Sequence, residues 1–125
     1  MIYDLPIVEL LGQHRGDRQL YMTTQPLMIL GWTIPKGFIT DLVSATEAQR
    51  DFLPLRQMAR SAVLHDALMN LTKLSRWSCN AEMYRQMKRD KVPWNIRVIV
   101  WLWLSRPWAP RVRWPQPSIE GEVFK

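Results

Sequence analysis

The order of apolar and polar positions divides the chain into an extended first third and a helical remainder. In the first third, apolar and β-branched residues run in short stretches separated by turn-forming residues, which is typical of strands. Turns are expected at 13–17 and 35–37, where glycine stands beside polar residues or proline. The strands are expected over residues 6–11, 19–24, 27–33 and 38–40. We expect them to form a small antiparallel sheet.

From Pro54 the spacing of apolar residues changes to three or four, which is the period of one helix face. The residues that set this period are Leu55, Met58, Ala62, His65 and Met69. They predict a helix over 54–71. A second helix is expected after the link 72–75 and should end before Val92, because a residue that precedes proline disfavours the helical conformation. A third helix is expected over 95–105.

The sequence therefore predicts an α+β fold with a single domain over 1–106, in which about three helices follow the sheet. Residues 107–125 are rich in proline and tryptophan, so we expect an extended C-terminal arm. This arm either packs across its own domain or docks on a neighbouring chain. The residues expected to make its contacts are Trp108, Arg111, Arg113, Trp114 and Phe124.

Composition and charge narrow the class of protein. The 125 residues can bury one core, and the single Cys79 excludes both an internal disulfide and a zinc site of paired cysteines. The net charge is +6, but residues 51–125 hold thirteen basic and six acidic side chains, hence +7, together with six of the seven tryptophans. Such a mixture suits single-stranded nucleic acid, a membrane interface or an acidic protein partner. It also fits basic side chains on solvated helix faces with tryptophan in the core.

Two further segments bear on location. The longest apolar run, Val98 to Leu104, is much shorter than the ~20 residues of a membrane-spanning helix. We therefore expect no transmembrane segment. We interpret the run as the buried central helix of a small domain, with a helix at a membrane interface as the alternative. Residues 1–11 lack the basic start and apolar run of a signal peptide, so we expect the chain to be made and kept in a cytoplasm.

The candidate chemistry centres on His65 and Asp66, on the first predicted helix. Adjacent residues point about 100° apart on a helix, so Asp66 cannot orient the imidazole of His65. Glu82 and Asp41 are the candidates for that role. An imidazole held by one carboxylate, with Asp66 or Asp41 free to bind a divalent cation, is a workable arrangement for activating water. The competing interpretation is a histidine that only ties the helix to the sheet.

Ser44 supplies a hydroxyl close to Asp41, and a Ser-His-Asp triad with His65 can be written down. No Gly-x-Ser-x-Gly elbow surrounds Ser44, and the phosphate-cradling glycine patterns are absent. Catalytic candidates are thus His65, Glu82, Asp41 and Ser44, and metal-binding candidates are Asp66 and Asp41. No cofactor is expected, with calcium or another divalent cation as the alternative.

Three blocks resemble a small family of tailed-phage and prophage proteins with the pattern GFxTDxxSxP, LHDxLY and an Ala-Asp helix. Here they read Gly37-Phe38-x-Thr40-Asp41-x-x-Ser44, Leu64-His65-Asp66-x-Leu68 and Ala81-Glu82. The second half is also similar, more distantly, to calcium-dependent phospholipases that use HDxxY. That similarity implies His65 as general base, Asp66 as a calcium ligand and Glu82 as the residue that orients the imidazole. The chain departs from these patterns at Val43, Thr46, Met69, Ser78 and Glu82.

The leading interpretation is a phage-encoded binding protein, made in the host cytoplasm and then part of the virion or its tail. Its basic, Trp-rich C-terminal part would dock on other virion proteins in an oligomeric assembly. The first alternative is a hydrolase of host-envelope lipid or peptidoglycan that uses the His-Asp site with a metal ion. The second is a nucleic-acid-binding accessory protein, whose affinity would fall steeply with salt.

Overall fold

Strands precede helices in the computed structural model, which describes residues 3–15, 18–42, 53–107 and 116. The described elements are β1 (Ile7–Arg15), β2 (Arg18–Thr23), β3 (Leu27–Ile29), β4 (Trp32–Ile34), β5 (Ile39–Thr40), α2 (Leu55–Leu71), α3 (Arg76–Arg89) and α4 (Trp94–Leu104). The α+β class is confirmed, as are the three predicted helices to within a few residues at each end. Periodicity located them well because each is long enough to show its repeat.

The strands form two antiparallel sheets, one in the order β1-β2-β5 and one made of β3 and β4. The prediction of one strand over 27–33 is wrong, because this segment folds back on itself and pairs Ile29 with Trp32. The two residues between them, Leu30 and Gly31, have φ values of 52° and 79°. A tight hairpin of the I′ kind needs positive φ at both positions, and leucine there gives little warning of it in the sequence.

The loop before β5 is held in place by a single threonine of β2. The hydroxyl of Thr23 accepts from the backbone nitrogen of Phe38 at 2.9 Å and donates to the carbonyl of Pro35 at 2.9 Å. Gly37 has φ +87°, a conformation that glycine adopts without a steric cost. The side chain of Phe38 is fully buried. The Gly-Phe pair of the sequence motif is therefore used to turn the chain into the core.

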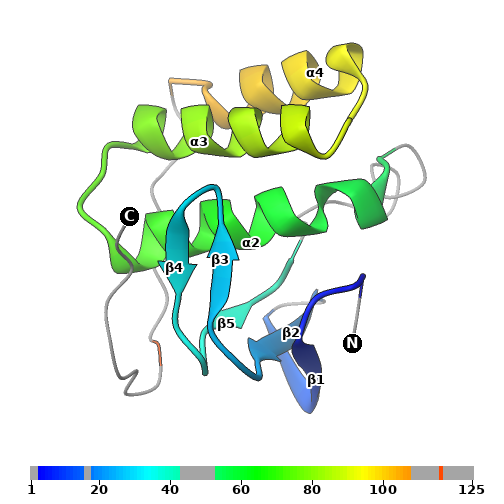
Figure 1. Cartoon of the computed structure of the whole chain (residues 1–125), viewed down its shortest axis with the longest axis vertical. Coiled ribbons are helices and arrows are strands. Elements are labelled where there is room, and N and C mark those ends of the chain that lie inside the picture. Colours follow the sequence, from blue (N-terminus) through cyan, green and yellow to red (C-terminus); the bar gives the residue numbers. More distant parts are fainter. Residues whose placement is uncertain (1–2, 16–17, 43–52, 108–115, 117–125) are drawn as a thin grey trace.

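The helices lie in successive layers (Figure 1). The longest, α2, packs against the strands and against α3, and α4 lies beyond α3 on the side away from the sheets. One core cluster joins the strands to α2 and is built around Phe38, Val63, Leu64 and Leu68. A second, smaller cluster joins the helices through Met58, Met83, Met87, Val92 and Ile96. No helix in the described ranges is long and apolar enough to cross a membrane.

The position of α4 corrects the interpretation of its apolar run. We expected 98–104 to be a buried central helix, but Ile96 is the one residue of α4 that is buried. Val100 and Leu104 are partly buried against the second cluster. Among the described residues, the strip of α4 that faces α3 is the part that packs against the second cluster.

Candidate functional site

His65 is held by an amide on the neighbouring helix. Its Nε2 atom lies 2.8 Å from Oδ1 of Asn80 on α3. The amide nitrogen of Asn80 lies 3.2 Å from the carbonyl oxygen of Leu104 and 3.3 Å from the hydroxyl of Ser105, both at the end of α4. A carbonyl only accepts, so the amide nitrogen must face Leu104 and the amide oxygen must face His65. Nε2 of His65 is therefore the donor in this contact.

Asp66 binds a different part of the molecule. Its Oδ2 atom accepts a hydrogen bond of 2.6 Å from the hydroxyl of Thr40, and that hydroxyl accepts from the backbone nitrogen of Leu42 at 3.0 Å. Leu42 has φ 58°, so the chain leaves β5 through a left-handed residue that Thr40 helps to fix. The Thr-Asp of one motif block and the His-Asp of the next thus meet through Thr40 and Asp66.

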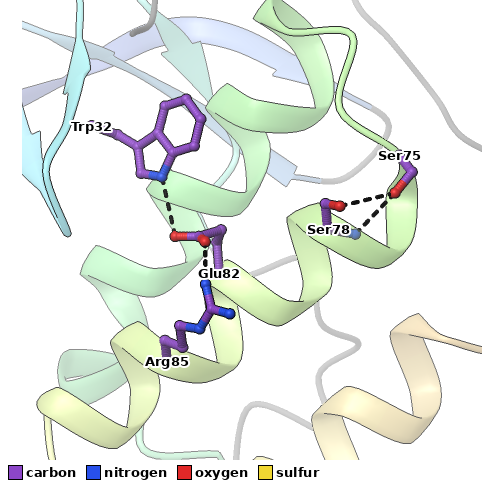
Figure 2. Close-up of polar contacts among 5 residues, drawn as sticks. All are labelled: Trp32, Ser75, Ser78, Glu82 and Arg85. Atoms are coloured by element: carbon purple, nitrogen blue, oxygen red, sulfur yellow. Dashed lines mark hydrogen bonds and ion pairs between the residues drawn. The ribbon is translucent and has the colours of Figure 1, made fainter. Parts of the chain in front are cut away.

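Glu82 faces the β3-β4 hairpin (Figure 2). Its Oε2 atom accepts from the indole nitrogen of Trp32 at 3.1 Å, and its Oε1 atom forms an ion pair with Arg85 one turn further along α3. The carboxylate is buried, whereas Arg85 is exposed. Glu82 therefore links α3 to β4, and Trp32 was not identified from the sequence as its partner.

Helix geometry separates Asn80, which bonds His65, from Glu82, which bonds Trp32. Residues two apart on a helix point about 200° away from each other, so these two side chains leave α3 on opposite sides. Asn80 faces α2 and α4, and Glu82 faces the hairpin. Asn80 stands three, four and seven residues before Met83, Tyr84 and Met87, so a polar side chain on the apolar face of the predicted helix is the sequence signal that could have pointed to it. In the structure Asn80 is 1% exposed.

Asp41 is buried beside Thr40 but lines a separate pocket with Tyr3, Gln19, Tyr21 and Leu42. Ser44, the proposed nucleophile, lies outside the described residues. Within the ranges that the structure describes, no group of three or more His, Cys, Asp or Glu side chains is placed to hold a metal ion. The two proposed metal ligands thus face different surroundings, with Asp66 on Thr40 and Asp41 at the pocket.

Of the C-terminal arm the structure describes Pro107 and Gln116, and Gln116 contacts the sheet. The side-chain amide of Gln116 accepts from the backbone nitrogen of Ile39 at 2.9 Å and donates to its carbonyl oxygen at 3.1 Å. Both backbone groups of one residue on β5 are thereby paired, as a further strand would pair them. The arm residues expected to make contacts, Trp108, Arg111, Arg113, Trp114 and Phe124, lie outside the described residues.

The second candidate site is the exposed face of α4. Its exposed large apolar side chains are Trp94, Val98, Ile99, Trp101, Leu102 and Trp103. Exposure of one apolar residue is ordinary, but several on one helix are typical of a contact surface. The apolar run that we interpreted as a buried helix therefore forms an exposed apolar surface.

Comparison with known proteins identifies a family. The model of a family described as a protein of unknown function, DUF1353, matches residues 20–104. No curated protein sequence and no solved structure matches the chain. The matched segment begins in β2 and ends with α4, so it includes His65, Asp66, Asn80 and Glu82.

Proposed function

Since the family model covers well over half of it, the chain belongs to the DUF1353 family, and we propose that it is a phage-encoded structural component that works by binding. In this proposal the chain is part of the virion or its tail. Its C-terminal arm docks on a neighbouring virion chain. The resemblance of its three sequence blocks to tailed-phage proteins supports a place in the virion. The contact of Gln116 supports docking of the arm on the edge of a sheet.

The contact of Gln116 carries the proposal. Within this chain the contact is of the first kind expected for the arm, packing on its own domain, and the same pair of hydrogen bonds is the means by which we propose that the arm recognises a sheet edge of a neighbour. Ile39 pairs with Met22 of β2. β5 is the last strand in the order β1-β2-β5, so among the described strands it forms an edge of this sheet. A primary amide that bonds both backbone groups of one residue recognises that edge whatever side chains surround it. In an assembly of identical chains, the same two hydrogen bonds can form between Gln116 of one chain and β5 of its neighbour.

The surroundings of His65 favour binding over hydrolysis. Its Nε2 atom is engaged by Asn80, and Asn80 in turn holds the end of α4. Asp66 holds Thr40, and Glu82 holds Trp32. His65, Asp66 and Glu82 therefore each connect two elements of the fold. The hydrolase alternative predicts that His65→Ala abolishes an activity on lipid or peptidoglycan and leaves the fold intact.

The test is incorporation into particles. Phage that encode the wild-type chain, a chain lacking 107–125, Gln116→Met or Gln57→Met would be purified on gradients and the chain quantified by mass spectrometry. We expect the wild type and Gln57→Met in particles, the truncated chain absent, and Gln116→Met reduced about tenfold, since it loses two hydrogen bonds worth about 0.5–1.5 kcal/mol each. Gln57 is an exposed glutamine on α2, so it controls for the substitution itself.

Two results would reject the proposal. One is full incorporation of the truncated chain, which would show that the arm does not dock. The other is absence of the wild-type chain from particles, which would place its work in the infected cell. Melting temperatures of the purified variants separate a docking defect from a folding defect.

A further inference from the structure

The outward face of α4 is almost continuously apolar. At about 100° per residue, Trp94, Val98 and Leu102 follow one another along a line on this face, with Trp101 beside them. Leu102 is 57% exposed and Trp94 70% exposed. Ile99 and Trp103, also exposed, extend the face on one flank. The helix therefore presents aliphatic side chains along its middle and indole rings at both ends.

The described residues of α4 and its two flanks carry positive charge. From residue 91 to residue 107 the chain has three basic residues, Lys91, Arg97 and Arg106, and no aspartate or glutamate. A surface with this composition attracts an anionic partner, and a second copy of the same surface would bring like charges together. The charge therefore argues against self-association through α4.

Two arginines lie against aromatic rings at the edges of this layer. The guanidinium of Arg106 stacks on the ring of Trp103, 3.7 Å from its centroid, and that of Arg97 lies 5.3 Å from the centroid of Tyr84. The guanidinium of Arg106 also donates to the carbonyl oxygen of Trp103 at 2.7 Å. These contacts keep cationic groups beside the apolar face, where they can meet phosphate groups while the apolar side chains leave water.

We propose that the outward face of α4 docks on the surface of an anionic lipid bilayer. Indole rings prefer the headgroup region, and aliphatic side chains of an in-plane helix enter the upper part of the acyl layer. Basic side chains beside them add attraction to anionic lipids. Nucleic acid could stack on the indole rings and bind the basic side chains, but it has no apolar region that would bury Val98, Ile99 and Leu102. These aliphatic side chains therefore favour lipid over nucleic acid.

This surface is distinct from the arm contact at Gln116, so the test uses the purified chain without any particle component. Flotation would measure binding to vesicles of phosphatidylcholine alone and to vesicles that also contain phosphatidylglycerol, at low and high salt. The variants are Leu102→Asp and, as the matched control, Leu11→Asp. Leu11 is 82% exposed on β1, a strand at the opposite end of the molecule from α4 (Figure 1).

We expect binding to the vesicles that contain phosphatidylglycerol, with weaker binding in high salt or to phosphatidylcholine alone. Leu102→Asp should weaken binding about tenfold or more, because an aliphatic side chain is replaced by a charge in the contact. Leu11→Asp should bind within about twofold of the wild type, since exposed sites away from the contact are nearly neutral. Arg106→Gln should weaken binding to the anionic vesicles about fivefold.

Three results would overturn the proposal. The first is no binding to phosphatidylglycerol vesicles at low salt, and the second is equal loss of binding in Leu102→Asp and Leu11→Asp. The third is a concentration-dependent dimer that Leu102→Asp dissociates, without vesicle binding, which would assign the face to a second copy of the chain. Circular dichroism of each variant identifies any loss of binding that comes from unfolding.

Discussion

At the scale of single residues, Asn80 uses both the donor and the acceptor of its amide to connect helices. It accepts from His65 of α2 and donates to Leu104 and Ser105 at the end of α4, while it belongs to α3 itself. An aspartate has the same shape but no donor, and a leucine has neither donor nor acceptor. The amide, itself buried, thus joins three helices through its hydrogen bonds.

Asn80→Asp should accordingly lower the free energy of unfolding by at least about 1–3 kcal/mol, because the carboxylate would face the carbonyl of Leu104 in a buried site. Urea unfolding followed by circular dichroism measures this difference. Asn95→Asp is the control, since Asn95 is exposed in the first turn of α4, where a negative charge stabilises the helix. Equal loss in both variants would mean that the three bonds of Asn80 contribute nothing specific.

The sequence identified some residues of this site and missed others for a physical reason. His65 and Asp66 stood out because ionisable side chains are unusual on a mainly apolar helix face. Asn80, Trp32 and Gln116 were missed, because each finds its partner 15, 50 or 77 residues away in the sequence. Local patterns carry no information about which distant groups a side chain will meet.

At the scale of elements, helix boundaries depend on local chemistry that the sequence does show. The link 72–75 ends in Ser75, whose hydroxyl accepts from the backbone nitrogen of Ser78 at 3.1 Å and so caps α3 (Figure 2). In contrast, α2 begins after Pro54 without a side-chain cap. Two predictions were wrong, the single strand over 27–33 and the buried position of α4. A run of apolar residues does not show where the chain reverses, and it does not show whether a helix lies in the interior or at the surface.

Removal of the cap should therefore weaken α3 in particular. Ser75→Ala should lower the free energy of unfolding by about 1 kcal/mol, and Ser75→Asp should restore it, since aspartate caps as well as serine and also suits the helix dipole. Thermal melts of both variants provide the measurement. Ser78→Ala leaves the capped backbone nitrogen in place, so a loss as large as that of Ser75→Ala would contradict the assignment of the cap.

At the scale of the whole molecule, the two core clusters differ in what they support. The larger one holds both sheets on α2, and the smaller, rich in methionine, holds α3 and α4. Local unfolding begins where few apolar side chains are buried, so the layered order predicts that α4 opens before α2. An outer helix that opens easily can shift its position when its exposed face binds a partner.

Ile96 and Ile99 of α4 allow this order to be tested with one substitution at two sites. Ile96 is 6% exposed and Ile99 is 49% exposed, although they lie one turn apart. Ile96→Ala should cost about 2–5 kcal/mol and speed hydrogen exchange of α4 amides more than that of α2 amides. Ile99→Ala should change little, because its side chain is already half in water. Uniform acceleration in α2 and α4 by Ile96→Ala would show instead that the three helices unfold as one unit, and α4 could then move only when the whole chain unfolds.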